Sequence, residues 1–216
     1  MLVTSYKPLK VYRYNKGFAR ICFENYQHLT KNVENPEDVF FSHLTNVSFQ
    51  KNSDKYNEHH GGKWPLETFR LYLELNFGKE RADYVFEQFD NVYLASLKSV
   101  QSVMCNDKHC FELYGYDIMV DDNFKAWLIE INASPSLSTT TKEDKKLKKS
   151  LINDLLNVVM PHNWLNDKKH TGSSTCTKNK IGDFDLLYDE SKDPNVPKTF
   201  KSKYDVNSKY QHFRKY

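Results

Sequence analysis

YGYDIMVDDNFKAWLIEINASP, residues 114–135, contains two runs of β-forming residues on either side of the polar segment Asp121-Asp122-Asn123. Two such runs around a short turn predict a β-hairpin. With a loop centred on Asp122-Asn123, Asp121 faces Phe124, and side chains alternate between the two faces of each strand. The expected apolar face then combines Tyr114, Tyr116 and Ile118, opposite Ile131, Ile129 and Trp127 in that order. The expected polar face combines Asp117, Leu128, Glu130 and Asn132.

The polar face of this hairpin suits a divalent cation. Asp117 and Glu130 supply two carboxylates and Asn132 an amide oxygen. Mg²⁺ takes a few such protein oxygens and leaves its other positions to phosphate and water. The expectation depends on the pairing register, because a slip of one residue moves Asp117 to the opposite face. An ordinary half-exposed hairpin with acidic outer residues stays open as the alternative.

The composition indicates a folded protein with polar segments attached. Hydrophobic residues make up 39% and aromatic residues 14% of the 216 residues, enough for one large or two small domains with a core. A net charge of +3 is too small to indicate nucleic-acid binding, and no apolar run has membrane-spanning length. The first six residues lack the features of a signal peptide. We therefore expect an intracellular protein without nucleic-acid or membrane partners.

The four cysteines give no sign of a disulfide framework, as expected in a reducing compartment. Cys105, His109 and Cys110 lack a second pair of zinc ligands at suitable spacing, so we expect no zinc site there. The adjacent His59 and His60 are interpreted as surface histidines, because neighbouring side chains diverge.

The first half of the chain predicts strands, then an irregular region, then helices. We expect strands over 2–6, 9–14 and 18–23, and an irregular region over 25–63 with a turn at 35–38. Pro65 suits a helical first turn, and the apolar spacing predicts a helix up to Asn76 that Gly78 ends. The strongest periodicity predicts a helix over 79–104 and indicates core packing.

A third helix is expected from the capping signal of Thr141 and Asp144 to about Val159. Its first turns carry five lysines: Lys142, Lys145, Lys146, Lys148 and Lys149. Lysines at a helix N-terminus oppose the helix macrodipole, which favours an acidic partner. A solvated basic face is the alternative. From His162 the sequence is polar and rich in lysine. Residues 191–216 are too polar to bury a core, and we expect them to be disordered.

Two residues outside the hairpin are candidates for anion binding. Arg20 alternates against apolar neighbours on its predicted strand, although a solvated strand arginine is the alternative. Lys63 follows two glycines, which allow the backbone to approach an anion closely. A single Gly-Gly-Lys is weak support by itself.

Several motifs together resemble the tubulin tyrosine ligase-like family. YGYD (114–117) followed by WLIEINASPSL (127–137) is similar to the family signature, and HLTNV (43–47) and GGKW (61–64) resemble two further motifs in the same order. NDKHCFE (106–112) and LIND (151–154) resemble the polyglutamylase branch more than the tyrosine ligase. The resemblance covers about residues 1–161, with a fainter echo at 188–190.

The resemblance implies an α+β fold of the ATP-grasp type. It also implies an ATP-dependent amino-acid ligase that adds L-glutamate to glutamate side chains of tubulin tails through an acyl phosphate. Carried over by motif, Asp117, Glu130 and Asn132 hold Mg²⁺. Thr45 and Asn46 contact ATP. Arg20 and Lys63 bind the incoming glutamate and, with Glu130, form the expected catalytic set.

The resemblance also implies partners and a location. Tubulin or microtubules, through their acidic tails, are the expected partners, and accessory subunits are possible in addition. The expected location is the cytoplasm and cytoskeleton, including the cilium or flagellum axoneme or basal body.

The resemblance places this chain in the C-terminal part of the family's catalytic core. In the family, an upstream lobe supplies phosphate-binding lysines and a nucleotide-covering sheet. The chain begins at Met1-Leu2-Val3-Thr4, just after that lobe. We therefore expect a partial ATP-grasp domain over 1–161, an extension over 162–190, and a lysine-rich tail over 191–216.

Such a chain alone is expected to bind ATP weakly and to turn over little. A non-catalytic tubulin-binding subunit or scaffold is the alternative function. An ATP-grasp ligase for another acidic protein is a third, which differs only in the acceptor and which sequence separates poorly.

Overall fold

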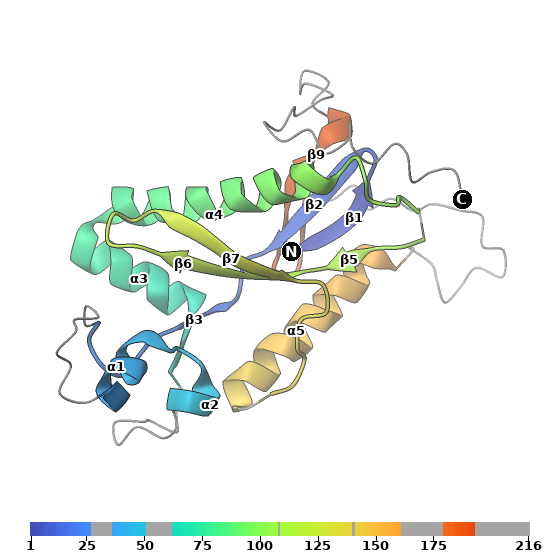
Figure 1. The fold of residues 1–216 in the computed structure, drawn as a ribbon. Helices are drawn as coiled ribbons and strands as arrows, with labels where there is room; N and C mark the ends of the chain where they lie inside the picture. The colour runs from blue at the N-terminus through green and yellow to red at the C-terminus, as the bar shows by residue number, and fades with distance from the viewer. Residues whose placement is uncertain (27–35, 51–61, 108, 140, 161–178, 193–216) are drawn as a thin grey trace, which may run out of the picture.

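The fold is built around a five-stranded antiparallel sheet. The computed structural model describes residues 1–26, 36–50, 62–107, 109–139, 141–160 and 179–192. The sheet has the order β5 (Glu112–Leu113), β1 (Leu2–Tyr6), β2 (Leu9–Tyr14), β9 (Phe184–Asp189) and β8 (Lys180–Ile181) (Figure 1). The predicted strands 2–6 and 9–14 are confirmed at those bounds.

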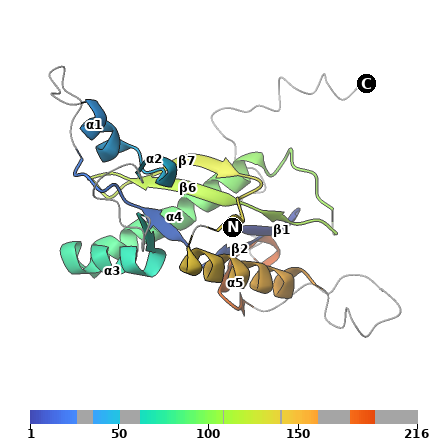
Figure 2. The ribbon, with the colours of Figure 1, turned by 90° about the horizontal axis from the view of Figure 1, so that it is seen from below.

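Two helices cover the two faces of this sheet. On one face Leu2, Tyr12 and Phe184 pack with Leu155 and Val158 of α5 (Lys142–Val159). The view from below shows α5 lying across β1 and β2 (Figure 2). On the other face, four buried side chains of β1 and β2 pack with Leu97 of α4 (Lys79–Val100). Alternation along β1 and β2 therefore builds two cores, one for each helix.

The α4 helix also supports the predicted hairpin. Its N-terminal half packs with α3 (Leu66–Phe77) and with the inner face of β6 (Gly115–Val120) and β7 (Ala126–Asn132). At 22 residues it spans about 33 Å, so one helix contacts both the hairpin and the main sheet (Figure 1). The two predicted helices are confirmed, although α4 ends at Val100 rather than at residue 104.

A second ribbon lies beside the hairpin. β3 (Phe18–Arg20) pairs antiparallel with β4 (Lys63–Pro65), so the predicted strand 18–23 is shorter than expected. Gly62 precedes β4 with φ +68, and a Cβ there would lie 3.2 Å from the Ile21 carbonyl oxygen. Glycine is therefore needed where the chain enters β4.

The region predicted to be irregular contains two short helices. α1 (Pro36–His43) begins at the proline that we interpreted as part of a turn, so that prediction is wrong. Proline is favoured in the first turn of a helix as well as in turns, which explains the error. α2 (Val47–Gln50) follows after a three-residue link. His59 and His60 lie outside the described residues.

The described part of the predicted extension joins the main sheet. β9 pairs with β2 along its length, and Glu190 of the short helix η1 (Glu190–Lys192) accepts hydrogen bonds from Leu9 N (2.7 Å) and Gln101 Nε2 (2.8 Å). Ser191 and Lys192 belong to η1, so the prediction of disorder from residue 191 is wrong for these two residues. Residues 193–216, the rest of the predicted tail, lie outside the described residues. The α+β class is confirmed. Within the described ranges, no helix combines the length and the apolar character that crossing a bilayer requires.

Candidate active site

The hairpin forms, but its pairing differs from the predicted register. Asp117 lies directly opposite Glu130, and Tyr116 lies opposite Ile131. A bulge then shifts the pairing by one residue, so that Ile118 faces Leu128 and Met119 faces Trp127. The predicted positions of Leu128 on the polar face and Trp127 on the apolar face are therefore wrong. The predicted pairs Tyr116–Ile129 and Ile118–Trp127 are wrong for the same reason.

The turn of the hairpin is one residue longer than predicted. Phe124 N donates to Asp121 O (3.0 Å), and Asp121 N donates to Lys125 O (3.0 Å), which gives a three-residue loop. Phe124 has φ +63 at the position where such loops need a left-handed residue. The Asp121 carboxylate accepts from Trp127 Nε1 (2.8 Å) and from two backbone N–H groups, and these bonds lower its pKa. The Asp121 side chain therefore stabilises the turn of the hairpin.

An acidic pair lies on the polar face of the hairpin. The Asp117 and Glu130 carboxyls are hydrogen-bonded to each other, and Asn132 Nδ2 donates to Glu130 Oε1 (3.1 Å). Partial desolvation and the bond with Glu130 raise the pKa of Asp117, whereas the Arg20 charge opposes this rise. Because Asp117 retains much of its exposure, we consider the neighbouring carboxyl the more important cause. Two carboxyls placed opposite each other suit a divalent cation.

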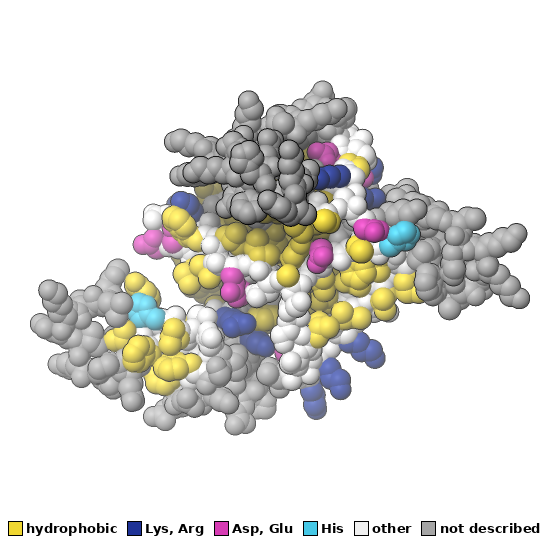
Figure 3. Space-filling model, turned by 45° about the vertical axis from the view of Figure 1, so that its right-hand side comes forward, with side chains coloured by type: hydrophobic (Ala, Val, Ile, Leu, Met, Phe, Trp, Pro, Cys, Tyr) yellow, Lys and Arg dark blue, Asp and Glu magenta, His cyan; other side chains and the backbone are white. Residues whose placement is uncertain are grey.

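A cationic pair lies on the β3–β4 ribbon. Arg20 and Lys63 are direct register partners, so their side chains share one face. The aromatic ring of Phe18 lies on the same face, with Lys63 Nζ 4.7 Å and Arg20 Cζ 5.8 Å from its centroid. The charge of Arg20 acts on Asp117, so the cationic and acidic pairs are within electrostatic reach of each other. Figure 3 shows basic side chains next to acidic ones on one face of the molecule.

A buried carboxylate contacts Lys63 of the cationic pair. Asp144, in the first turn of α5, lies 3.3 Å from Lys63 Nζ and 3.2 Å from Lys148 Nζ. The sequence suggested Asp144 only as part of a cap, and Thr141 Oγ1 does accept from Asp144 N (3.1 Å). Its contact with Lys63 joins residues 81 positions apart, so no local pattern could show it.

The predicted nucleotide residues are in the link between α1 and α2. Asn46 is exposed, and its carbonyl oxygen accepts from Phe49 N (3.0 Å) and Gln50 N (2.9 Å). Among the described residues, neither Thr45 nor Asn46 has a hydrogen bond to the acidic or cationic pair. The structure thus brings Asp117, Glu130 and Asn132 together and sets Arg20 and Lys63 beside them, with Thr45 and Asn46 on a separate segment.

Gln50 links that segment to the residues that follow β3, a role that the sequence did not predict. Its side chain is buried, with Nε2 donating to the carbonyl oxygens of Phe41 (2.9 Å) and Leu44. Its Oε1 accepts from Phe23 N (3.3 Å), three residues beyond Arg20. A buried, fully bonded glutamine at the end of a helix has no distinguishing sequence pattern.

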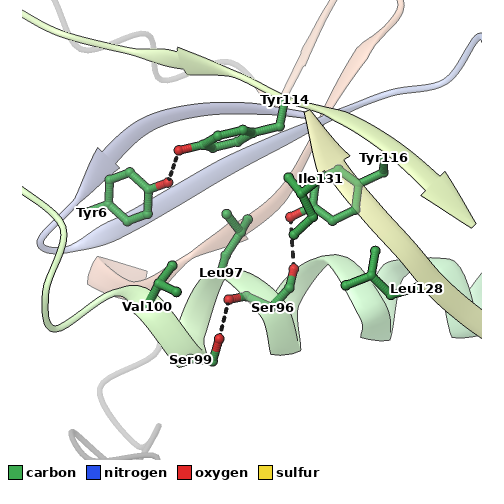
Figure 4. A pocket seen from close by; sticks show the side chains of 9 residues that line it. All are labelled: Tyr6, Ser96, Leu97, Ser99, Val100, Tyr114, Tyr116, Leu128 and Ile131. Carbon is green, nitrogen blue, oxygen red and sulfur yellow. Dashed lines mark hydrogen bonds between the residues drawn. The ribbon is translucent and has the colours of Figure 1, made fainter. Parts of the chain in front are cut away.

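A cavity of about 360 Å³ lies on the opposite face of the hairpin, against α4 (Figure 4). Tyr6 and Tyr114 hydroxyls meet at 2.7 Å, and Ser96 Oγ meets the Tyr116 hydroxyl at 2.8 Å. Tyr116 alternates with Asp117 along β6, so the cavity and the acidic pair face different sides. In the described residues, no three His, Cys, Asp or Glu side chains gather into a group that could hold a metal ion.

Known proteins share this sequence over much of its length. A probable alpha-tubulin polyglutamylase, Ttll1 of Tetrahymena thermophila, is 51% identical over 209 residues, which are 96% of this chain and 50% of that protein. A probable tubulin polyglutamylase, TTLL9 of Rattus norvegicus, is 43% identical, with coverage of 88% and 38%. The tubulin polyglutamylase TTLL5 of Homo sapiens is 35% identical, with coverage of 74% and 13%.

The chain therefore spans about half, or less, of the length of these relatives. The family model described as the tubulin-tyrosine ligase family matches residues 1–168, which include the acidic pair, the cationic pair and Asp144. On this match and these identities, the chain belongs to the tubulin-tyrosine ligase family.

Proposed function

We propose that this chain contributes the metal-binding and amino-acid-binding part of an ATP-dependent ligase. The ligase adds L-glutamate to glutamate side chains of tubulin tails. The relatives are named tubulin polyglutamylases, which supports the substrate class. The ATP-grasp architecture of the whole protein belongs to the same proposal. The remaining nucleotide contacts are assigned to the part of the relatives' length that this chain does not match, so the chain alone is expected to bind ATP weakly.

One observation carries the proposal. Asp117 and Glu130 face each other within reach of the charge of Arg20, whose strand partner is Lys63. Phosphoryl transfer to a carboxylate brings several anions together, and their charge must be neutralised while the groups are aligned. The acidic pair would bind a metal ion, and the adjacent cationic pair would bind a carboxylate. Together they would neutralise the charge and align the reacting groups.

The residues fit Mg²⁺ by the chemistry of their donors. Asp117 and Glu130 offer carboxylate oxygens in direct proximity, and Asn132 uses Nδ2 for Glu130, which leaves Oδ1 as its metal donor. When bound, the ion neutralises phosphate charge. We assign Glu130 the central position among the three metal ligands, because it contacts both Asp117 and Asn132.

The proposed reaction has two steps. A γ-carboxylate oxygen of the acceptor glutamate attacks the γ-phosphorus of ATP, the bond to ADP breaks, and an acyl phosphate forms. The α-amine of the incoming glutamate then attacks the acyl carbon, phosphate leaves, and one proton is released as the isopeptide bond forms. Arg20 and Lys63 hold carboxylates of the incoming glutamate, and Arg20 suits two-point binding of a carboxylate. Thr45 and Asn46 are assigned to the nucleotide.

The acceptor tail is proposed to approach over α5. Four lysines of this helix are exposed: Lys142, Lys145, Lys146 and Lys149. Basic side chains project at the lower edge of the face in Figure 3. Such a surface raises the local concentration of an acidic peptide. With tubulin as its partner, the protein is proposed to act at the cytoskeleton, including ciliary microtubules. Accessory subunits also belong to the proposal.

The test measures labelled glutamate incorporated into tubulin, with ATP and Mg²⁺, by a polypeptide extended to the full length of the relatives. Glu130→Gln is expected to lower the rate about a hundredfold or more, because a metal-binding carboxylate is lost. Glu87→Gln, at an exposed position of α4, is the matched control and should retain the rate. An unchanged rate in Glu130→Gln would refute the metal assignment.

The basic face of α5 also supports a second function, a non-catalytic subunit that binds tubulin. Binding would then need no ATP and would fall steeply with added salt. Sedimentation of the chain with microtubules, with and without ATP, separates the two functions. Salt-sensitive binding together with no glutamate incorporation by the extended polypeptide would favour the scaffold.

A further inference from the structure

Asp144 is buried where the cationic ribbon meets α5. Its side chain is 3% exposed, and those of Lys63 and Lys148 are each 16% exposed. Lys63 Nζ lies 3.3 Å from Oδ2, while Lys148 Nζ lies 3.2 Å from Oδ1 and 3.4 Å from Oδ2. A carboxylate this far from water is stable only with cations close to it.

The charges in this cluster do not cancel. One carboxylate is shared by two ammonium groups, so Asp144, Lys63 and Lys148 together carry a charge of +1. Arg20, the strand partner of Lys63, adds a second positive charge on the same face. Asp144 therefore holds Lys63 in place and offsets only one of the three positive charges of Lys63, Lys148 and Arg20.

The contacts also restrict the Lys63 side chain. Lysine has four flexible carbons, and ordering its side chain costs rotamer entropy. Asp144 contacts the ammonium from α5, and Phe18 contacts it from β3 through its ring. Because the ammonium is already ordered, ligand binding does not require this loss of rotamer entropy again.

We propose that Asp144 is a positioning residue that orients Lys63 for a carboxylate of the incoming amino acid. This inference rests on the proposed function, because Lys63 is the residue assigned to that carboxylate. Asp144 acts through Lys63, and its effect is confined to amino-acid binding. Nucleotide binding, assigned to other residues, is unaffected.

A purely structural role for Asp144 is the competing account. Lys148 Nζ also donates to the Ser138 carbonyl oxygen, so this lysine anchors the loop after β7 to α5. Loss of Lys148 therefore loosens α5 and leaves the Lys63–Asp144 contact in place. Lys148→Met is the matched control that separates anchoring of α5 from orientation of Lys63.

The first experiment measures the acylation rate of each lysine in this chain with an N-hydroxysuccinimide ester, read by peptide mass spectrometry. Asp144→Asn should raise the rate at Lys63 about fivefold, the effect of losing a partly screened ion pair. Exposed Lys180 is the internal reference and should not change. Lys148→Met should not raise the rate at Lys63. A rise there, or an unchanged rate in folded Asp144→Asn, overturns the positioning role.

The second experiment adds L-glutamate during acylation and reads the rate at Lys63 as a ratio to that at Lys180, because the amine of glutamate also consumes the ester. Glutamate should protect Lys63 in the wild-type chain, and Asp144→Asn should need a several-fold higher concentration for the same protection. No protection in the wild type would refute the proposed amino-acid site, whereas equal protection in both proteins would refute only the role of Asp144. In the extended polypeptide, Asp144→Asn should raise KM for glutamate and leave KM for ATP unchanged.

Circular dichroism checks that each variant is folded. If Asp144→Asn does not fold, Asp144→Glu takes its place, because it retains the charge on a longer side chain. Its Lys63 acylation rate should lie closer to that of the wild type than to that of the exposed reference lysine. A rate equal to the reference overturns the proposal.

Discussion

Asp117 lies directly opposite Glu130 in the hairpin, and partial burial together with a hydrogen bond to Glu130 raises the pKa of Asp117. Two carboxyls in this position repel each other once both have lost their protons. A divalent cation bound between them would turn this repulsion into attraction. The site is therefore expected to be less stable without metal than with it, and this difference can be measured in the chain alone.

Asp117→Asn is expected to raise the melting temperature of the metal-free chain, because it removes one of the two negative charges. The same change should abolish the rise in melting temperature that millimolar Mg²⁺ produces in the wild type, since ligand binding stabilises only a protein that binds it. Asp122→Asn, in the hairpin turn, is the control for removing a carboxylate and should keep the Mg²⁺ effect. A Mg²⁺ effect of equal size in Asp117→Asn would remove this residue from the metal site.

The sequence predicted this acidic pair although it misplaced the strands. The observed pairing near Asp117 differs from the expected one by two residues, and a shift of two leaves every side chain on its own face. The bulge beyond it changes the pairing by one residue, which exchanges Leu128 and Trp127 between faces. Neither a bulge without glycine nor the positive φ of Phe124 has a clear sequence signal.

Contacts between distant segments could not be predicted in the same way. Strands and helices follow from local periodicity, so β1, β2, α3 and α4 were found close to their observed bounds. The Asp144–Lys63 and Gln50–Phe23 contacts depend on how those elements pack, and a single sequence does not reveal it.

Gln50→Leu is expected to loosen the segment that carries Thr45 and Asn46. The substitution leaves the carbonyl oxygens of Phe41 and Leu44 without their buried donor, at a cost of roughly 1–3 kcal/mol each. Hydrogen exchange read by mass spectrometry should become faster in peptides covering 36–50 and at Phe23, with little change in α4. Gln88→Leu, whose side chain bonds the Phe124 carbonyl oxygen instead, should affect the hairpin peptides and spare 36–50. The reverse pattern would contradict the role of Gln50.

Tyr93 should make stability depend on pH in the alkaline range. Burial raises the pKa of its hydroxyl to about 12 from an ordinary value of 10.0. Between these values the folded state keeps a proton that the unfolded state has lost, so the free energy of unfolding falls as the pH rises. Tyr93→Phe should reduce this fall by up to about 2–3 kcal/mol. Urea titrations at pH 9 and 11.5 measure it, with exposed Tyr84→Phe as the control. An equal fall in wild type and Tyr93→Phe would show that Tyr93 does not cause it.

Gly182→Ala tests how α5 is attached to the main sheet. Gly182 lies in the turn between β8 and β9 with φ +56, and a Cβ there would lie 2.3 Å from the Asp154 carboxylate. Asp154, buried on α5, accepts from Asp183 N (3.0 Å), so it cannot retreat without losing this bond. Strain of the backbone and the steric clash together should cost about 2–4 kcal/mol in a urea titration.

Gly78→Ala separates the two contributions. Gly78 has φ +86 and ψ 157 with no atom within 4 Å of the added Cβ, so Gly78→Ala should show only a backbone cost, of about 1–3 kcal/mol. In the double variant Gly182→Ala with Asp154→Ala, the clash disappears, and the loss should be smaller than the sum of the two single losses. Additive losses in the double variant would show that the contact with Asp154 does not hold α5 against the β8–β9 turn.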